Sequence, residues 1–451
     1  MNTDEIKTML GRRDFLQSAA ATGAGLVLGP VVLGQAGRSR KSEDINVALI
    51  GAGEQGKTLM MDCLKMVGVR FKAVCDIWPY NRDWVSGRLR AYQHRHNCYE
   101  DYKEMLAQEN DLDAVIIATP DCWHAEHTIA CLEAGLHVYC EKEMSNKLAD
   151  ARRMVLAARK TGRLLQIGHQ RRSNPRYIFC YEKILKEAKL LGQITAVNGQ
   201  WNRAVQPTLG WPEGTGLDEK TLNRYGFDSM EQLRNWRWYK NLGGGPIVDL
   251  GSHQIDIYNW FLQARPTSVI ASGRTNFYSK KTHEWYDTVM AIYEYATDQG
   301  AVTAFYQTIS SNSSQGYFES FLGHEGTLVI SEPASRCAVY REDWVQEQEW
   351  TPWVNKGYLE QEEGLEQDEQ AESVGQIRTP SPQPAKYNLL VTMDKKFHQP
   401  QLENFFNAVR GKAKLNCPAE VGYETAVTVL KVNEAVQQGH KLDFEPGEFG
   451  V

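Results

Sequence analysis

A chain of 451 residues, of which 42% are hydrophobic and 24% charged, has the composition of a soluble globular protein with room for two domains, not that of a disordered chain. A formal net charge of −6 argues against a general nucleic-acid-binding surface, and no basic stripe with interleaved aromatic residues is present. The nine cysteines are odd in number and lack CxxC spacing, so we interpret them as buried small hydrophobic residues and not as a disulfide framework.

The N-terminal residues 1–37 resemble a twin-arginine (Tat) export signal. Arg12 and Arg13 precede an uncharged stretch that ends at Leu33, and a small-residue segment follows. We expect cleavage near Ala36 and export of the folded protein to the periplasm by the twin-arginine machinery. Retention of the leader as a membrane anchor is the alternative, although the uncharged stretch contains glycines and a proline and is short for a membrane span.

Strands and helices are expected to alternate from residue 45 to residue 169. The predicted strands are 45–50, 71–76, 114–118, 137–140 and 164–168, and the predicted helices are 56–66, 81–93, 101–109, 123–134 and 147–160. This alternation is typical of a parallel, doubly wound sheet. Residues 44–170 are therefore predicted to form an N-terminal Rossmann domain in an α/β protein.

The first predicted strand ends in the sequence GAGEQG, residues 51–56, and passes directly into a helix. Gly51 permits the tight turn, Gly53 lets the backbone approach a pyrophosphate, and Gly56 lets helix and strand pack closely. Asp76 ends the second strand, where it can accept hydrogen bonds from a ribose diol. A 2′-phosphate would meet a like charge there, which favours NAD over NADP. A glycine turn without a nucleotide is the alternative.

The pattern changes beyond residue 192 to longer alternating runs. These are 287–295, 301–308, 316–322 and 327–331, and a long helix is predicted at 419–438. Residues 171–440 are therefore expected to form a C-terminal α/β domain with an open, predominantly antiparallel sheet. Within it, residues 342–386 are rich in Glu, Gln and Pro and are predicted to be a surface excursion, and residues 441–451 an extended tail.

Two sequence blocks follow predicted strands at the sheet edge where cofactors bind in doubly wound folds. In the block ATPDCWH, His124 shares a helical face with His127, but no third ligand has suitable spacing, so no metal is expected. In the block CEKE, Lys142 could stabilise an alkoxide that forms during hydride transfer. A solvated ion pair is the alternative for this lysine.

A third block, GGGPIVDLGSHQID, places Asp249 and His253 one turn apart if residues from 247 onward are helical. The carboxylate could then orient the imidazole and stabilise its protonated form, which is a general-base arrangement. A helix-capping aspartate and a satisfied core histidine fit the spacing equally well.

Together these blocks resemble the Gfo/Idh/MocA family of oxidoreductases over essentially all of the chain after the leader. The matching segments are GAGEQG with Asp76, ATPDCWH, CEKE where the family usually has EKP, LLQIGHQRRSNP, and GGGPIVDLGSHQID. The resemblance implies a bound nicotinamide cofactor, a sugar or polyol substrate, and an open sheet that often makes homodimer or homotetramer contacts.

The resemblance also assigns residues to roles. It implies a catalytic trio of Lys142, Asp249 and His253, in which His253 takes the hydroxyl proton and Lys142 stabilises the oxygen. The cofactor-binding residues would be Gly51, Gly53, Glu54, Gln55, Gly56, Asp76, Thr119, Pro120, His124, Glu141, Lys142 and Gln170. The substrate-binding residues would be Arg171, Arg172, Trp201, Trp236, Trp238, Tyr239 and His253, because aromatic rings that face a cleft can stack on sugars, although most aromatic residues fill cores. Glu143 replaces the familiar proline and could hold Lys142 protonated.

Three functions remain open at this stage. The first is an exported NAD-dependent oxidoreductase that acts on a sugar, sugar derivative or glycoside with a tightly bound, self-recycled cofactor. The second is an NAD-dependent glycoside hydrolase that works by transient oxidation, elimination and re-reduction. The third is a nucleotide-bound sensor that has lost catalysis, and the replacement of the family's proline by Glu143 would be the sign of that loss.

Overall fold

The structure is a computed structural model that describes residues 44–362 and 384–451. The predicted export signal at 1–37 lies outside the described residues. Within the described part of the chain, no helix combines the length and the apolar character that crossing a membrane requires.

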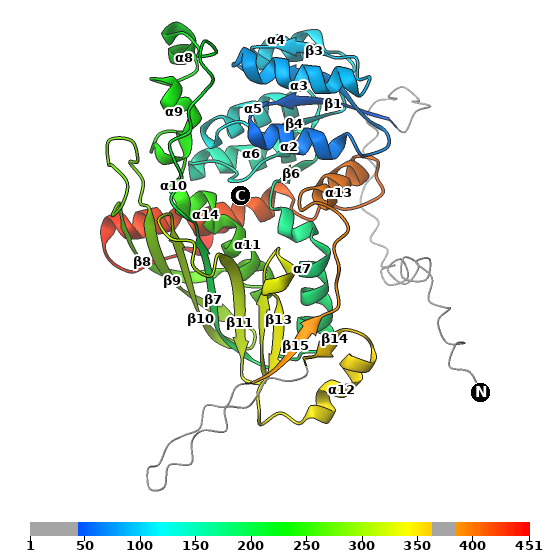
Figure 1. Cartoon of the computed structure of the whole chain (residues 1–451), viewed down its shortest axis with the longest axis vertical. Coiled ribbons are helices and arrows are strands. Elements are labelled where there is room, and N and C mark those ends of the chain that lie inside the picture. Colours follow the sequence, from blue (N-terminus) through cyan, green and yellow to red (C-terminus); the bar gives the residue numbers. More distant parts are fainter. Residues whose placement is uncertain (1–43, 363–383) are drawn as a thin grey trace, which may run out of the picture. The chain divides into compact units, whose positions relative to one another are not determined.

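The N-terminal sheet has the strand order β3-β2-β1-β4-β5-β6, and each neighbouring pair runs parallel (Figure 1). Its strands are β1 (Ile45–Ile50), β2 (Val69–Cys75), β3 (Asn97–Tyr99), β4 (Ala114–Ile117), β5 (His137–Cys140) and β6 (Leu165–Ile167). The helices between them are α2 (Glu54–Cys63), α3 (Pro79–Ala91), α4 (Tyr102–Gln108), α5 (Asp121–Glu133) and α6 (Leu148–Thr161). The predicted Rossmann fold is confirmed.

Both faces of this sheet are buried, which is why its strands are almost continuously apolar. Successive residues of β1 point to opposite faces, so Val47 and Leu49 pack on one side while Ala48 and Ile50 pack on the other. The face of Val47 is covered by α2 and α3, whose Leu59 and Val85 are fully buried against it.

The Rossmann core also includes a helix from far along the chain, α13 (Gln399–Val409). Its Leu402, Phe405 and Phe406 are buried in the cluster on the α2 face. Gln401 donates a hydrogen bond from Nε2 to the carbonyl oxygen of Ile167, 2.7 Å away, at the edge strand β6. Helix α13 therefore joins the Rossmann core from far beyond the predicted boundary at residue 170, and this long-range return leaves no local signal in the sequence.

The second sheet has the order β14-β15-β13-β12-β11-β7-β10-β9-β8-β16. Its strands are β7 (Ile194–Asn202), β8 (Pro266–Arg274), β9 (Thr288–Thr297), β10 (Gly300–Ile309), β11 (Tyr317–Gly323), β12 (Gly326–Ile330), β13 (Ala338–Arg341), β14 (Leu359–Gln361), β15 (Ala385–Leu389) and β16 (Leu442–Asp443). The β7–β10 pair is parallel and the other neighbouring pairs are antiparallel, which confirms the predicted open and mostly antiparallel sheet.

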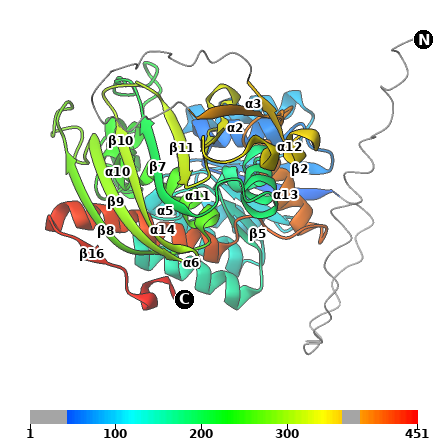
Figure 2. The same cartoon turned by 90° about the horizontal axis from the view of Figure 1, so that it is seen from below.

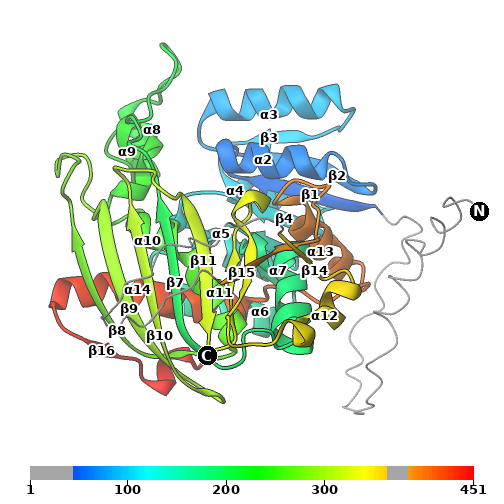
Figure 3. The same cartoon turned by 60° about the horizontal axis from the view of Figure 1, so that its bottom comes forward.

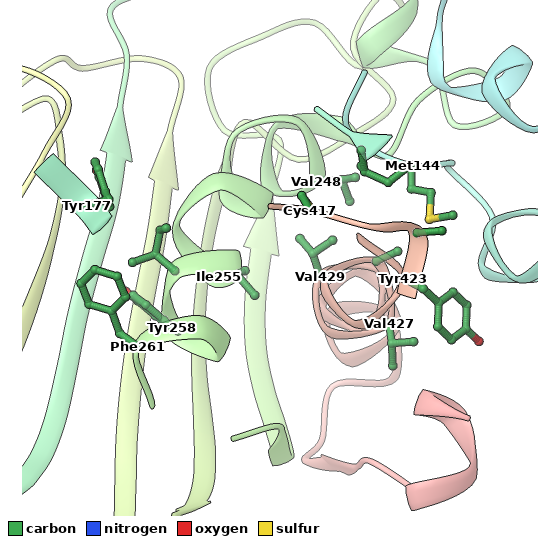
Figure 4. Close-up of a cluster of buried hydrophobic side chains, with 14 of the residues drawn as sticks. Met144, Tyr177, Val248, Ile255, Tyr258, Phe261, Cys417, Tyr423, Val427 and Val429 are labelled. Atoms are coloured by element: carbon green, nitrogen blue, oxygen red, sulfur yellow. The ribbon is translucent and has the colours of Figure 1, made fainter. Parts of the chain in front are cut away.

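Two helices, α11 (Gly251–Leu262) and α14 (Ala419–Gln438), cover one face of this sheet. Figure 4 shows Val429 of α14 on the side that faces Ile255 of α11, while Tyr258 and Phe261 of α11 lie over the strands. The Tyr258 hydroxyl donates to the carbonyl oxygen of Phe305, 2.9 Å away. Helix α14 also packs against α6, so it ties the second sheet to the Rossmann domain (Figure 2).

Short helical segments complete the described chain. They are η1 (Gln170–Ser173), α7 (Pro175–Phe179), the π-helix η2 (Cys180–Glu187), α8 (Glu219–Arg224), α9 (Met230–Arg234), η3 (Trp236–Trp238), α10 (Gly245–Asp249), η4 (Ala334–Arg336), α12 (Glu347–Asn355) and η5 (Pro446–Phe449).

Two predictions about the C-terminal half need correction. The segment 342–386 was expected to be a surface excursion, but its described part contains α12 and β14, and Trp350 of α12 is 2% exposed. The buried Trp350 holds this short helix against the domain, and the Glu- and Gln-rich composition of the segment gave no indication of it. The tail at 441–451 is not merely extended either, because β16 joins the edge of the sheet and Phe449 is buried.

Residues 203–242, which we call the arm, connect β7 to α10 and carry α8 and α9. The arm stands beside the Rossmann domain (Figure 3). The indole Nε1 of Trp78, just beyond β2, donates to the carbonyl oxygen of Thr215 in the arm, 2.6 Å away. Trp78 also packs in one apolar cluster with Leu222 and Phe227 of the arm. The arm therefore covers the end of the Rossmann sheet at which β2 terminates.

Candidate active site

The glycine-rich turn after β1 has the shape that a dinucleotide requires. Gly51 has φ +91°, and a Cβ there would lie 2.6 Å from the carbonyl oxygen of Ala118. A Cβ at Gly56 would lie 1.9 Å from the carbonyl oxygen of Gly51, so this glycine permits close packing of α2 on β1. A Cβ at Gly53 would meet nothing within 4 Å, so this residue faces open space at the N-terminus of α2. Free N–H groups and open space together fit a pyrophosphate.

Asp76 is held at the end of β2 by two backbone donors. Its Oδ2 accepts from the N–H of Ala52 at 2.6 Å, and its Oδ1 accepts from the N–H of Trp78 at 2.8 Å. Each oxygen keeps a lone pair that could accept a ribose hydroxyl. The glycine turn and this carboxylate therefore fit the adenosine and pyrophosphate parts of a dinucleotide.

A cavity of about 820 Å³ begins at this turn and runs between the Rossmann domain, the arm and the second domain. Such a volume is in the range of cofactor and substrate sites. The predicted site residues that line it are Gly51, Gly53, Glu54, Gln55, Asp76, Thr119, Pro120, Glu141, Lys142, Gln170, Trp201, Trp236, Trp238, Asp249 and His253. Gly56, His124, Arg171, Arg172 and Tyr239 are not among the lining residues.

His124 lies beneath the cavity, where it connects two of its loops. Its Nδ1 is 2.7 Å from the carbonyl oxygen of Glu143, and its Nε2 is 2.8 Å from that of Thr119. The ring is 1% exposed. We therefore replace the predicted cofactor contact with a structural role that fixes the positions of Thr119 and Lys142. No group of three or more His, Cys, Asp or Glu side chains that could hold a metal ion occurs in residues 44–362 and 384–451.

Lys142 and Asp249 form a pair inside the cavity. The lysine Nζ lies 3.0 Å from Asp249 Oδ1 and also donates to the Asp249 carbonyl oxygen. Arg237 of the arm places its Nε 3.2 Å from the same Oδ1. Burial disfavours the carboxylate, but Lys142, Arg237 and Arg203 hold the pKa of Asp249 below its ordinary value. Asp249 is therefore ionised and fixes the ammonium group.

His253 is not paired with Asp249, contrary to the sequence prediction. The helix is interrupted at Leu250, so that α10 ends at Asp249 and α11 begins at Gly251. Burial, aided by the charges of Lys142 and Arg171, lowers the pKa of His253 well below its ordinary value. Its Nδ1 is buried without a hydrogen-bond partner in the described structure. The imidazole is thus neutral, not held protonated, and can accept a proton.

Arg171 and Arg172 belong to the protein interior and not to a substrate contact. Arg171 is 1% exposed, pairs with Glu319, and places its NH2 3.3 Å from Glu332 Oε2. Arg172 binds both carboxylate oxygens of Asp256 at 2.8 and 2.9 Å. The sequence prediction was wrong here because these acidic partners lie 84 to 161 residues away along the chain.

Glu143, which replaces the familiar proline, does not contact Lys142 through its side chain. It is fully buried, and its Oε1 accepts from the N–H of Met144 at 2.6 Å. Its Oε2 has no partner among the described residues, and burial raises the pKa of Glu143 to about 8. The carboxylate that pairs with the lysine is therefore Asp249, and Glu143 is a largely protonated core residue at neutral pH.

Three of the four aromatic residues predicted to bind substrate line the cavity, namely Trp201, Trp236 and Trp238. The Trp201 ring lies 5.4 Å from the ring of His253, which places an apolar plane beside the general-base candidate. Several lining side chains were not predicted from the sequence: Asp121, Arg203, Arg237, Glu332 and His398. Of these, only Asp121 stood in a quoted block, and the others become visible only when distant segments come together.

The chain belongs to the Gfo/Idh/MocA oxidoreductase family. The family's NAD-binding Rossmann-fold model matches residues 45–169, and its C-terminal α/β-domain model matches residues 187–444. The predicted family and enzyme class are confirmed.

Individual relatives are more distant. The chain is 27% identical over 227 residues to the 1,5-anhydro-D-fructose reductase of Ensifer adhaerens, which covers 50% of this chain and 59% of that protein. It is 30% identical over 171 residues to a glycosyl hydrolase family 109 protein of Shewanella baltica. This match covers 33% of this chain and 37% of that protein. The chain thus spans less than two thirds of the length of these curated relatives.

The fold is shared with a crystal structure of aldose-aldose oxidoreductase from Caulobacter crescentus complexed with glycerol. The TM-score is 0.64, the sequences are 18% identical, and the match covers 89% of this chain and all of that one.

Proposed function

We propose that this protein is an NAD-dependent oxidoreductase that acts on a hydroxyl group of a sugar, sugar derivative or glycoside. The observation that carries the proposal is that Lys142 and His253 line the same cavity as the dinucleotide turn at Gly51 and Gly53. The similarity to 1,5-anhydro-D-fructose reductase supports a carbohydrate as the substrate.

Each residue of the trio has a distinct role in this reaction. A bound nicotinamide supplies the hydride acceptor. The neutral imidazole of His253 takes the proton from the substrate hydroxyl. Lys142 holds its ammonium at the substrate oxygen and stabilises the negative charge that develops there. Asp249 positions Lys142 and Arg237 through its Oδ1.

NAD is the proposed cofactor in preference to NADP. Asp76 presents a carboxylate, fixed by two backbone N–H groups, at the place where the ribose of a dinucleotide lies in this type of fold. A 2′-phosphate would be repelled by this charge. Gln55, whose Nε2 donates to Glu141 Oε1 at 2.9 Å, supports the turn that would face the pyrophosphate.

The arm favours a cofactor that stays bound. The arm makes other contacts to the Rossmann domain besides the Trp78–Thr215 hydrogen bond. The NH2 of Arg224 lies 3.0 Å from Asp101 Oδ2, and the hydroxyl of Tyr225 lies 3.2 Å from Glu100 Oε1. Trp78, Arg224 and Tyr225 line the cavity together with Asp76, so these contacts would hinder the release of an adenosine bound there. If the cofactor does not leave, the chemistry must be redox-neutral, with one carbonyl reduced for each hydroxyl oxidised. The likeness in fold to an aldose-aldose oxidoreductase agrees with such a cycle.

We further propose export to the periplasm through the twin-arginine leader, with or without its cleavage. A cofactor loaded before export and then retained would suit a compartment without a nicotinamide pool. The leader is tested by fusing residues 1–37 to a reporter and comparing its location in cells with and without the twin-arginine machinery.

The open face of the second sheet is proposed to carry the contacts of a homodimer or homotetramer. Ile270 pairs with Ile292 on adjacent strands, and together with Met290 these side chains are 42 to 44% exposed. Adjacent exposed apolar side chains on a sheet face are typical of an interaction surface. Light scattering on the purified protein measures the subunit number, and a monomer at micromolar concentration would contradict the proposal.

A redox glycoside hydrolase is the second candidate, and the similarity to a glycosyl hydrolase family 109 protein favours it. In that reaction the hydroxyl is oxidised, the acidified neighbouring C–H is lost with the glycosidic bond, water adds, and the ketone is reduced again. Release of phenol from aryl glycosides without net change in NAD would identify it. Net oxidation of one sugar with reduction of another would identify the oxidoreductase.

The primary experiment determines the nucleotide that copurifies with the enzyme. The protein is purified without added cofactor and denatured, and the released nucleotide is identified by mass spectrometry and absorbance. Stoichiometric NAD or NADH is the expected result, with a lower content in Trp78→Ala, because this change removes the contact to the arm. An empty wild-type protein would contradict cofactor retention, and failure of all sugars to react would leave only the nucleotide-bound sensor.

A further inference from the structure

Three cations surround a single carboxylate at the catalytic end of the cavity. Asp249 is shared between Lys142 and Arg237, and Arg203 adds a third positive charge that also acts on this carboxylate. Asp121 and Glu141 lie near Arg237, but burial raises the pKa of Asp121 to about 7, so it is only partly ionised at neutral pH. Glu141 and the partly ionised Asp121 therefore offset part of the positive charge at this end of the cavity.

Arg203 differs from the other basic residues of the cavity. Its guanidinium has no hydrogen-bond or ion-pair partner within residues 44–362 and 384–451, and it lies 5.6 Å from the centre of the Trp201 ring. By contrast, Lys103 lies 3.6 Å from Glu126 and Arg224 lies 3.0 Å from Asp101, while Arg234 donates to the carbonyl oxygen of Gly210. Among the lysines and arginines that line this cavity, Arg203 is thus the one with no side-chain donor bound to an acceptor in the described part of the chain.

The position of Arg203 places it beside the reacting groups. Trp201 and Arg203 are alternate residues at the end of β7, and both line the cavity. His253 is a second neighbour of Trp201, at 5.4 Å between ring centres. A sugar that offers a hydroxyl to His253 would therefore bring another of its substituents toward Arg203.

A half-buried guanidinium with free donors fits a planar anion better than a neutral hydroxyl group. Its N–H donors form a fork that matches a carboxylate in a bidentate manner. We propose, on the basis of the proposed sugar oxidoreductase activity, that Arg203 is a substrate-binding residue and that the preferred substrate is an acidic sugar whose carboxylate it binds. A phosphate ester would share the negative charge, but a single arginine offers it fewer donors than phosphate sites normally do.

Binding measurements test this inference without the need for turnover. Calorimetry on the full-length protein compares two sets of ligands. The acidic set is the methyl glycosides of glucuronic, galacturonic and mannuronic acid, called uronides below, and the neutral set is the methyl glycosides of glucose, galactose and mannose. At least one uronide is expected to bind about 10- to 100-fold more tightly than its neutral partner, which is the usual contribution of a hydrogen bond to a charged group. Arg203→Gln should abolish this ratio, and Arg203→Lys should keep part of it.

Arg234→Gln is the matched control, because it removes the same charge from the same cavity but lies away from Trp201, over the Trp78 ring. The uronide preference should survive in this variant. Equal binding of acidic and neutral sugars by the wild type would overturn the inference, and so would a preference that survives Arg203→Gln. Tighter binding of a methyl glycoside 6-phosphate than of every uronide would overturn the choice of a carboxylate.

Turnover of the same panel separates this inference from the proposed activity. Reaction of neutral glycosides without any uronide preference would contradict the role of Arg203 alone. Absence of reaction with every sugar would contradict the oxidoreductase, while the binding ratio would still decide whether Arg203 recognises a carboxylate. Circular dichroism and cofactor content confirm that each variant is folded.

Discussion

Asp249 accepts a hydrogen bond from Lys142, with 3.0 Å between Oδ1 and Nζ, although the two residues are 107 positions apart in the sequence. The pair is mostly shielded from solvent, with 12% and 15% of the two side chains exposed. A shielded pair of this kind holds the ammonium group, proposed above to be catalytic, in one orientation.

Lys142→Met should lower kcat by about 10² to 10³, because it removes the group that stabilises the developing oxyanion. Asp249→Asn should lower kcat less, since the ammonium group remains but loses its ionic partner. Stopped-flow measurement of bound-cofactor reduction gives both values. Lys160→Met on the surface serves as the control. Equal rates for Lys142→Met and the wild type would remove the lysine from the mechanism.

The pH dependence should reveal the neutral state of His253. Its pKa is lowered mainly by burial, so the imidazole accepts a proton from substrate across neutral pH and loses this capacity only in acid. The acidic limb of kcat/KM is expected well below pH 6.5. His253→Ala should abolish this limb and lower turnover by about 10² to 10⁴ while cofactor content stays unchanged. An acidic limb at or above pH 6.5 in the wild type would contradict the assignment.

Asp76→Ala should weaken NAD binding and reduce the preference for NAD over NADP. The carboxylate that repels a 2′-phosphate is then absent, and the hydrogen bonds to the ribose are lost. Fluorescence titration of the apoprotein with each nucleotide measures both effects. Asp83→Ala, on the neighbouring helix α3, provides a control for loss of one negative charge. Unchanged affinity for NAD in Asp76→Ala would exclude the ribose contact.

Glu143 should make the protein less stable as the pH rises. Burial raises its pKa from 4.5 to about 8, so between these values the folded state holds a proton that the unfolded state has lost. This contribution to stability is complete below pH 4.5 and is lost as the pH rises toward and through 8.

Glu143→Gln keeps an acceptor for the Met144 N–H and cannot ionise. Relative to the wild type, this variant should gain about 3 to 5 kcal/mol in free energy of unfolding between pH 5 and pH 9, the cost of an uncompensated buried charge. Urea unfolding at both pH values measures the gain, with the exposed Glu182→Gln as control. A difference between wild type and Glu143→Gln that does not change with pH would contradict the buried-acid assignment.

The Rossmann half could be predicted in detail because its signals are local. Gly51, Gly56 and Asp76 lie within one strand–helix–strand unit, and continuously apolar strands are typical of sheets buried on both faces. The strands of the second sheet could be predicted for the same reason, since buried and exposed residues alternate along β9. Local periodicity determined both architectures.

The chemistry of the site was less accessible from the sequence. The spacing of Asp249 and His253 indicated a pair, but it could not show the break at Leu250 or the competition from Lys142 and Arg237. The QRR segment looked like a substrate contact because nothing near it in the sequence offers Arg171 or Arg172 an acidic partner. Partners supplied by distant strands and helices decide whether such an arginine faces a ligand or the core.

Helix α13 is a part of the Rossmann core that comes from late in the sequence. Its apolar residues reach the Rossmann core only after residue 409 has been added to the chain, although the sheet they cover is finished by residue 167. Residues up to 409 must therefore be synthesised before α13 can cover the α2 face of the nucleotide-binding sheet. The core of that half thus includes a segment that is translated long after the sheet itself.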